Sequence, residues 1–324
     1  MKKLISLLLA LVMALSLVAC GSKDSKKNDE SLELTVFAAA SLTESLTAIG
    51  DKYMAENKNV KISFNFDSSG KLLTQIEEGA VCDLFISAAP KQMNALDGSL
   101  KDNSEKNPKG QDLLVAGSRI DLLENKVALA VTEGNPTGVG SFDKLADLLK
   151  SGDVKLAIGN SDVPVGQYTQ KIFNFHSIDE SAIADKLTYG SNVKEVATAV
   201  AEGTVDCGII YASDAYSAKL TVAAEASADM CGQVIYPAAI LNTSTQQDAA
   251  AAFLQYLQSA EASAEFEKVL FIPPEQVILY PFPLYRAGRF TRPAHTPFVP
   301  SINQGKYACR SMLLGGPLWI GIPS

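Results

Sequence analysis

The chain has 324 residues, of which 47% are hydrophobic and 20% are charged, with 28 basic and 36 acidic side chains and a formal net charge of −8. This composition excludes a disordered chain and leaves room for two globular domains. Proteins that bind nucleic acid need a basic surface, so the net negative charge excludes nucleic acid as a partner. The two histidines, His176 and His295, are too few and too isolated for a histidine metal site or a general-base relay, so catalysis is not expected.

The N-terminal part of the chain has the features of an export leader followed by a tether. Two lysines precede an apolar run over residues 4–18, which is too short for a comfortable membrane span and is typical of a secretory signal peptide over residues 1–19. The run ends in Leu-Val-Ala-Cys-Gly, which resembles the lipobox of bacterial lipoproteins and predicts lipidation at Cys20. The alternative is an ordinary signal peptide that contains a cysteine. Residues 20–31 are polar and charged and are expected to form a lipidated tether.

Short β-branched runs alternate with longer helical stretches from residue 32 onward, which predicts parallel sheets covered by helices. The predicted strands cover residues 33–41, 60–66, 82–90, 125–131, 154–160, 186–192, 205–211 and 232–240. The predicted helices cover residues 42–57, 67–79, 141–152, 161–175 and 193–203. Ligands bind such sheets at the carboxyl ends of the strands, so the strand-to-helix junctions are the candidate sites.

The first three junctions offer hydroxyls and free backbone N–H groups. Ser41 follows the first strand, and Ser68 and Ser69 follow the second. At the third junction a proline suits the first helical turn, and Val165 and Gly166 after it would offer N–H groups without an intrahelical partner. Each serine could also be an ordinary helix cap.

The fourth junction is expected to be a capped helix start, with Asn192 as the N-cap and Glu195 completing a capping box. The fifth junction ends in Tyr211, the polar group of its strand. One cap proves nothing, but several such junctions could together surround one anion, because helix N-termini carry unpaired N–H donors and a partial positive charge.

The C-terminal part has a different composition. From residue 273 onward, 52 residues hold nine of the 14 prolines and four of the five arginines. This shift predicts an atypical Pro/Arg-rich tail over residues 272–324, which is either a true extension or an out-of-frame or fused segment. Without the +2 of the leader and the +4 of the tail, the net charge of −8 becomes −14 for residues 20–272. An anion bound by so acidic a body must be held by local dipoles.

Five motifs carry a resemblance to a known family: TVFAAASLTESL, FNFDSSGKLLTQIEEGA, CDLFISA, DVPVGQY and GIIYASDA. Together they closely resemble the molybdate-binding proteins of bacterial ABC importers, over about residues 33–271, in the same order and at similar spacing. The resemblance implies an α/β fold of the two-lobed periplasmic-binding-protein type (type II), with a mixed sheet covered by helices in each lobe. Lobe 1 would comprise residues 32–120 plus 232–271, and lobe 2 residues 121–231. The chain would cross between the lobes near Asn125 and Gly232, and the ligand would bind in the cleft between them.

The resemblance also implies which residues hold the ligand, a tetrahedral oxyanion. Carried over motif by motif, these are Ser41, Ser69, Val165, Val193 and Tyr211. Hydroxyls and backbone N–H groups would donate to molybdate or tungstate, and the metal would be bound only as that oxyanion, through the same residues. The family often carries further hydroxyls in the second motif, where this chain has Gly-Lys after the serines.

The resemblance further implies a transport role without catalysis and without a cofactor. The protein would be a monomer held at the outer face of the cell membrane by the lipid at Cys20, and it would deliver its ligand to an ABC permease. No nucleic acid partner is expected.

Two other functions are considered. A secreted hydrolase is disfavoured because no G-x-S-x-G motif occurs and His176 lies far along the chain from the serine loops, where a partly buried histidine on a surface helix is the better interpretation. A binding protein for another oxyanion is closer. Sulfate, like molybdate, is fully deprotonated at pH 7 and suits a site of donors only, whereas phosphate keeps a proton and calls for an acceptor carboxylate. Only the resemblance favours molybdate over sulfate.

Two further pairs of residues remain open. Asp206 and Asp214 flank the two ends of one strand and are expected to point apart as solvated charges. Cys207 and Cys231 could form a disulfide in an exported protein or could be buried thiols, and the chain offers no C-x-x-C pair for a zinc or redox site.

Overall fold

The computed structural model describes residues 32–152 and 154–273, all within one structural unit, Met1–Val277. The predicted signal peptide (1–19), Cys20, the tether (20–31) and the tail from residue 274 lie outside the described residues. No helix in the described part is both long and apolar enough to cross a membrane.

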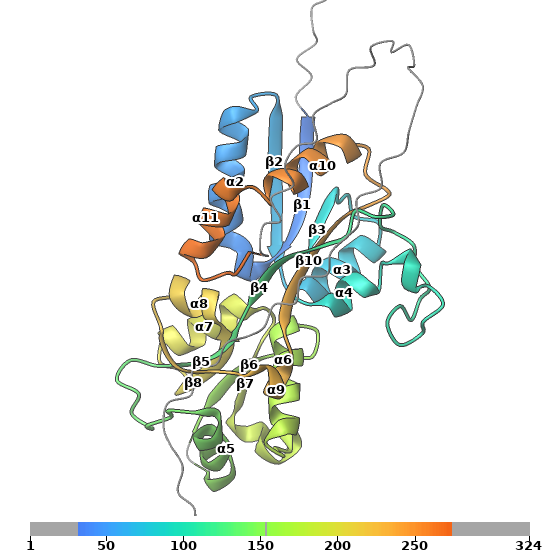
Figure 1. Ribbon diagram of the computed structural model, residues 1–324. Helices are drawn as coiled ribbons and strands as arrows, with labels where there is room; N and C mark the ends of the chain where they lie inside the picture. The colour runs from blue at the N-terminus through green and yellow to red at the C-terminus, as the bar shows by residue number, and fades with distance from the viewer. Residues whose placement is uncertain (1–31, 153, 274–324) are drawn as a thin grey trace, which may run out of the picture. The chain divides into compact units, whose positions relative to one another are not determined.

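Lobe 1 is built on a five-stranded sheet with the order β2-β1-β3-β10-β4 (Figure 1). Its strands are β1 (Leu32–Ala39), β2 (Val60–Asp67), β3 (Leu84–Ile86), β4 (Ile120–Asn125) and β10 (Val234–Ile240). β1 runs parallel to β2 and β3, whereas β10 runs antiparallel to β3 and β4. The sheet is therefore mixed, as the family resemblance implied, and not parallel throughout as the strand-helix alternation alone suggested.

Helices cover both faces of this sheet because successive strand residues point to opposite sides. α2 (Thr43–Glu56), α10 (Gln247–Tyr256) and α11 (Ala260–Lys268) pack on one face, and α3 (Ser69–Glu77) and α4 (Pro90–Asn94) pack on the other (Figure 1). Along β1, Val36 and Ala38 belong to the core under α2, while Phe37 belongs to the core under α3. A short 3₁₀ turn, η2 (Gly98–Leu100), follows α4.

Lobe 2 is built on a second five-stranded sheet with the order β7-β6-β8-β5-β9. Its strands are β5 (Val127–Val131), β6 (Leu156–Gly159), β7 (Leu187–Gly190), β8 (Cys207–Tyr211) and β9 (Thr221–Glu225). β6 is parallel to β7 and β8, and β5 is antiparallel to β8 and β9. The helical segments are α5 (Phe142–Ser151), α6 (Pro164–Phe175), η3 (Glu180–Lys186), α7 (Val193–Ala201), α8 (Ala212–Ser217) and α9 (Ala228–Cys231).

The chain crosses between the lobes twice, after β4 and before β10. β4 pairs with β10 in the first sheet, so lobe 1 continues to Asn125 and does not end at residue 120 as predicted. The predicted end of the fold at residue 271 is also early, because the backbone of Ile272 exchanges hydrogen bonds of 2.8 and 2.9 Å with Glu124 of β4. Both differences arise because these segments pair with strands that are distant in the sequence, which no local pattern reveals.

The cysteines of the described part are free thiols. Cys207 begins β8 and Cys231 ends α9, and no disulfide joins them. Both thiols are buried, and the thiol of Cys82 is also free and buried. Burial raises the pKa of Cys207 to about 12, so its thiol stays protonated and unreactive.

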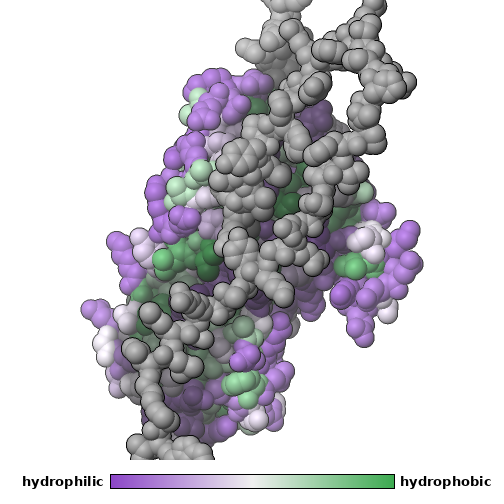
Figure 2. All heavy atoms as spheres, viewed as in Figure 1, coloured by the Kyte–Doolittle hydropathy of each residue, from purple (hydrophilic) through white to green (hydrophobic). Residues whose placement is uncertain are grey.

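Hydrophilic residues predominate among the coloured residues on the face of the molecule that Figure 2 shows.

Candidate functional site

A small cavity between the lobes brings together all five residues predicted to hold the ligand. Its lining includes Ser41, Ser69, Val165, Val193 and Tyr211. The cavity has an empty volume of about 200 Å³, which includes open solvent at its mouth, so the enclosed space is smaller still. The cavity is therefore suited to a small ion.

Ser41 lies in η1 (Ala40–Leu42), the short turn between β1 and α2, and it is not a helix cap. Its side chain is 3% exposed, and its Oγ lies 2.9 Å from the hydroxyl of Tyr236 on β10. The interpretation of Ser41 as a simple cap is therefore wrong, because the hydroxyl bonds to Tyr236 of β10 beside the cavity rather than to the first turn of α2.

Ser68 and Ser69 divide two roles at the start of α3. Ser68 is the N-cap and accepts from the Lys71 N–H at 3.4 Å. Ser69 is the first helical residue, is fully buried, and accepts from the Ala88 N–H at 3.0 Å. The cap is thus Ser68, which leaves the hydroxyl proton of Ser69 available to the cavity, and Ser68 also lines the cavity.

Val165 and Val193 bring the N-termini of two helices of lobe 2 to the cavity. Val165 follows Pro164 in the first turn of α6, and Val193 opens α7 after its N-cap Asn192. The first N–H groups of a helix have no intrahelical partner and carry a partial positive charge. Gly166 is needed here, because a Cβ at this position would lie 2.2 Å from the Asn160 carbonyl oxygen.

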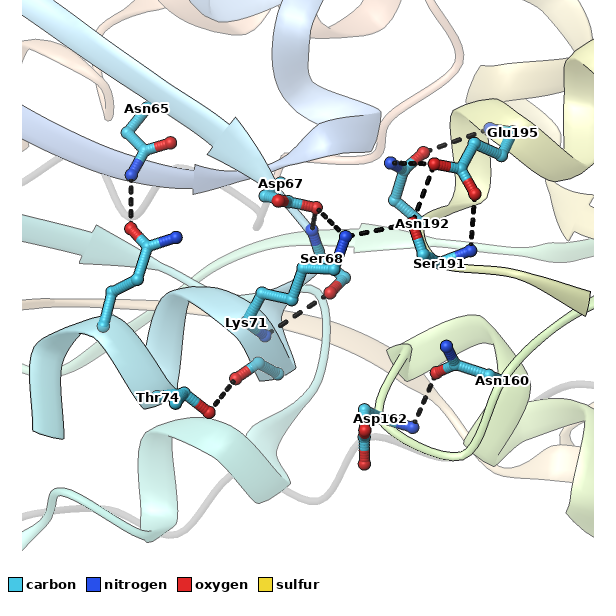
Figure 3. Close-up of polar contacts among 12 residues, drawn as sticks. Asn65, Asp67, Ser68, Lys71, Thr74, Asn160, Asp162, Ser191, Asn192 and Glu195 are labelled. Carbon is cyan, nitrogen blue, oxygen red and sulfur yellow. Dashed lines mark hydrogen bonds and ion pairs between the residues drawn. The ribbon is translucent and has the colours of Figure 1, made fainter. Parts of the chain in front are cut away.

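The cap of α7 differs in one detail from the predicted capping box. Asn192 Oδ1 accepts from the Glu195 N–H at 3.0 Å, as expected. The Glu195 carboxylate, however, accepts from the N–H and the hydroxyl of Ser191, each at 2.7 Å, instead of the N–H of Asn192. Figure 3 shows this arrangement. The Glu195 carboxylate thus binds the backbone one residue before the position used in the usual capping box. That residue, Ser191, also contacts Lys71 of the opposite lobe.

Tyr211 ends β8 and is 1% exposed, with its ring edge-on to Tyr236 at 5.7 Å. Burial raises the pKa of its phenol well above the ordinary value, so the hydroxyl remains protonated. Among the described residues that hydroxyl has no hydrogen-bond partner. Buried hydroxyls require one, so Tyr211 offers a proton to the cavity.

The polar groups that this cavity offers to a ligand are donors, set among apolar residues. Among the described residues that line it, none is acidic, and the serine, tyrosine and helix N-terminal groups can all donate. Such a set can hold an oxyanion without a lysine or arginine in contact. An anion that is fully deprotonated fits, because each of its oxygens can accept.

Polar contacts join the two lobes beside the cavity (Figure 3). Lys71 Nζ of α3 lies 2.9 Å from Ser191 Oγ of lobe 2 and 3.4 Å from Asp67 of its own lobe. At Gly70, a Cβ would lie 2.2 Å from the Asp162 carbonyl oxygen of the opposite lobe. The Gly-Lys pair, where the family often carries hydroxyls, thus serves the contact between the lobes and does not line the cavity.

One predicted surface charge is buried. Asp206 accepts from the Lys155 N–H at 2.7 Å and lies at the other end of β8 from Asp214, so the two carboxylates do point apart. Asp214 is 1% exposed, 3.4 Å from Lys194, and burial raises its pKa to about 7 although Lys194 opposes the shift. The expectation of a solvated Asp214 is wrong because α8 packs this first-turn residue against α7.

His176 does not join any serine of the cavity. It caps the C-terminal end of α6, and its Nδ1 lies 3.5 Å from Asp143 of α5. The serines that line the cavity therefore have no imidazole within the described site to activate them as nucleophiles.

Three residues behind the cavity were missed from sequence: Tyr236 of β10, Asn125 of β4 and Ser213 of α8. Asn125 Nδ2 lies 2.8 Å from Ser213 Oγ and 3.3 Å from the Tyr236 hydroxyl, which in turn contacts Ser41. Tyr236 looks like any core aromatic of a buried strand, so only the polar Asn125 at a predicted lobe crossing offered a signal.

Comparison with known proteins places the chain among transport proteins. The profile of the family "Bacterial extracellular solute-binding protein" matches residues 34–269. YvgL of Bacillus subtilis, provisionally named as an ABC transporter substrate-binding lipoprotein, is 34% identical over 84% of this chain and 99% of its own. The molybdate-binding protein ModA of Haemophilus influenzae is 31% identical over 72% of this chain and 87% of its own. Among solved structures, the substrate-binding domain of a provisionally named molybdenum ABC transporter from Clostridium difficile is 32% identical, with a TM-score of 0.56 over 76% of this chain and 100% of that one.

Proposed function

Because the chain belongs to the family of bacterial extracellular solute-binding proteins, we propose that it captures molybdate, or tungstate, and delivers it to the permease of an ABC transporter. Relatives at 31% identity and below are named molybdate-binding proteins, which supports this ligand. The ligand is bound and released unchanged, so the protein is a transport component and not an enzyme, and its site needs no further cofactor.

One observation carries the proposal: a cavity between the lobes is lined only by donors and apolar groups. Ser41, Ser69 and Tyr211 supply hydroxyls, and the N-terminal turns of α6 and α7 supply N–H groups. A desolvated dianion gains from each of these hydrogen bonds, since bonds to charged groups contribute about 1.5–3 kcal/mol. The same dianion would be repelled by a carboxylate, and the described lining has none.

Sulfate is the alternative ligand, because it presents the same charge and the same four acceptor oxygens. Hydrogen phosphate is disfavoured, since its proton needs an acceptor that this lining does not offer. The donor chemistry supports any fully deprotonated tetrahedral oxyanion, and the named relatives favour molybdate within that class.

The leader features support attachment of the mature protein to the outer face of the cell membrane through a lipid on Cys20. We further propose that the protein acts there as a monomer. One of its relatives is named as a lipoprotein. Labelling of cells with a fatty acid, followed by mass spectrometry, tests this attachment. Label that persists in Cys20→Ala would contradict it.

Calorimetric titration of the full chain with molybdate tests the ligand. The titration is repeated in excess sulfate and then with phosphate. One-to-one binding of molybdate that survives sulfate is the expected result. A response to sulfate alone would keep the class of protein and change the ligand, and no response to any of the three anions would contradict the oxyanion site.

A further inference from the structure

A buried chain of hydrogen bonds leads into the cavity from β4 and β10, the paired strands beside which the chain crosses between the lobes. Asn125 Nδ2, at the end of β4, lies 3.3 Å from the hydroxyl of Tyr236 on β10, and that hydroxyl lies 2.9 Å from Ser41 Oγ. All three side chains are buried, and Tyr236 is 0% exposed. Tyr236 is not part of the cavity lining, so it acts on a ligand through the lining residues that it contacts, Ser41 by a hydrogen bond and Tyr211 by ring packing.

The backbone fixes the orientation of the Asn125 amide. Its Oδ1 accepts from the Lys126 N–H at 2.8 Å, and an N–H can only donate, so Nδ2 must be on the side that faces Tyr236. The same Nδ2 donates to Ser213 Oγ at 2.8 Å. Asn125 therefore presents a donor to the Tyr236 oxygen and cannot accept the phenolic proton.

Ser41 is therefore the acceptor that we assign to the single proton of the Tyr236 hydroxyl. Ser41 and Asn125 lie at hydrogen-bond distance from this hydroxyl, and of these two only Ser41 can accept. A buried hydroxyl without an acceptor would be unfavourable by the free energy of its lost hydrogen bond. When Ser41 accepts from Tyr236, its own proton is turned away from Tyr236 and is available to the cavity.

Ser69 is arranged in the same way by a different donor. The Ala88 N–H donates to Ser69 Oγ at 3.0 Å, which leaves the Ser69 proton free for the cavity. Both serines predicted to hold the ligand, Ser41 and Ser69, thus accept from the protein and can donate to a ligand. Ser69 receives its bond from the backbone, and Ser41 depends on a side chain.

We infer that Tyr236 is a positioning residue that determines specificity, because by donating to Ser41 it keeps Ser41 a donor to the ligand. A serine that is free to turn could accept the proton of an anion such as hydrogen phosphate or hydrogen arsenate. With one of its two acceptor positions filled by Tyr236, Ser41 directs its own proton to the ligand and favours anions without a proton. The inference rests on the proposed function and names the residue behind its selectivity.

Tyr236→Phe tests this role, since it removes the phenolic hydroxyl and keeps the ring that packs edge-on against Tyr211 and Phe271. Tyr256→Phe in α10 is the matched control, because Tyr256 does not line the cavity. The probes are molybdate and hydrogen arsenate, a tetrahedral dianion that keeps one proton near neutral pH. Affinities are measured by titration with molybdate and by competition with arsenate.

We expect Tyr236→Phe to bind molybdate about tenfold more weakly, as for loss of one oriented donor to a charge, and to bind hydrogen arsenate as well as or better than the wild type. The preference for molybdate then narrows at least about tenfold, while Tyr256→Phe keeps both wild-type affinities. An equal loss for the two anions would show a merely structural role and overturn the inference. Unchanged preference, or no detectable arsenate binding by Tyr236→Phe, would overturn it as well.

Asn125→Asp provides a second test if Tyr236→Phe does not fold. A carboxylate oxygen in place of Nδ2 can accept the phenolic proton, so the Tyr236 hydroxyl no longer has to donate to Ser41. The preference for molybdate over hydrogen arsenate should therefore narrow in this variant too, and an unchanged preference would overturn the inference. If the wild-type protein binds sulfate instead of molybdate, the proposed ligand changes to sulfate. The affinities of the variants are then measured for sulfate and hydrogen phosphate in the same way. A wild-type protein that binds no oxyanion overturns the proposed function together with the inference.

Discussion

Lys194 of α7 forms an ion pair with Glu44 of α2, at 2.7 Å between Nζ and Oε2, although the two residues lie 150 positions apart and in different lobes. The hydrogen bond between Lys71 and Ser191 is a second contact of this kind, at 2.9 Å. Both contacts need the lobes to be closed upon each other, so they stabilise the arrangement that encloses the cavity.

Glu44→Gln should weaken molybdate binding by up to about fivefold, because the ion pair it breaks is partly exposed and such pairs contribute about 0.2–1 kcal/mol. Titration at low and high salt checks this, and the difference from the wild type should shrink as salt screens the pair. Glu33→Gln is the control, since it breaks the pair with Lys61, which joins neighbouring strands of lobe 1 only. The same loss in both variants would contradict a role in closure.

Ser41→Ala and Tyr211→Phe should each weaken molybdate binding by about 10- to 150-fold, because each removes one donor to a desolvated dianion, which is a loss of about 1.5–3 kcal/mol. Both variants should keep the circular dichroism spectrum of the wild type. Calorimetric titration measures the affinities, with Tyr256→Phe as the control for removal of a phenolic hydroxyl. Wild-type affinity in both site variants would contradict the assignment of the cavity.

Gly70→Ala should separate stability from binding. Alanine favours the helical state by up to about 1 kcal/mol over glycine, so the ligand-free protein should unfold at an equal or higher urea concentration. The added Cβ would lie 2.2 Å from the Asp162 carbonyl oxygen of the other lobe. This clash should oppose closure of the lobes and lower the affinity for molybdate. Gly140→Ala is the control, because a Cβ there meets nothing within 4 Å. Undiminished affinity in Gly70→Ala would mean that closure does not bring these two segments together.

Asp214 should make the protein less stable as the pH rises from about 4 to about 7. Burial raises its pKa in the folded protein from 3.8 to about 7, so over this range the folded state holds a proton that the unfolded state has lost. The free energy of unfolding therefore falls with increasing pH and levels off above pH 7.

Asp214→Asn tests this dependence, since an amide does not ionise. Urea unfolding at pH 5 and pH 8 measures the free energy of unfolding of both proteins. The difference between the variant and the wild type should shift in favour of the variant from pH 5 to pH 8. Asp121→Asn, which removes an exposed carboxylate on β4, should keep the wild-type dependence. A wild-type pH profile in Asp214→Asn would show that another group is responsible.

The junction residues could be predicted because each follows a buried strand and precedes a helix in the sequence. Ser41, Ser69 and Val165 follow β1, β2 and β6, and all three reach the same cavity. The direction of the strands could not be predicted, because β5 and β10 are antiparallel to their neighbours in sheets that the alternation of strands and helices marks as parallel.

The groups behind the cavity could not be predicted, because their roles depend on contacts between distant segments. Tyr236 meets Asn125 only through the pairing of β10 with β4, and Asp214 is buried only because α8 packs on α7. Sequence shows that such residues are polar or aromatic, and it does not show which partner lies across from them.

The double crossing of the chain also sets an order for folding. The sheet of lobe 2 is made from one continuous stretch of chain, β5 to β9. In lobe 1, one edge of β3 stays unpaired until β10 is present, and β10 follows the whole of lobe 2 in the sequence. Pairing over such long loops is slow. A chain released from N-terminus to C-terminus can thus complete its inserted lobe first, while the earlier lobe remains unfinished until the last helices, α10 and α11, have emerged.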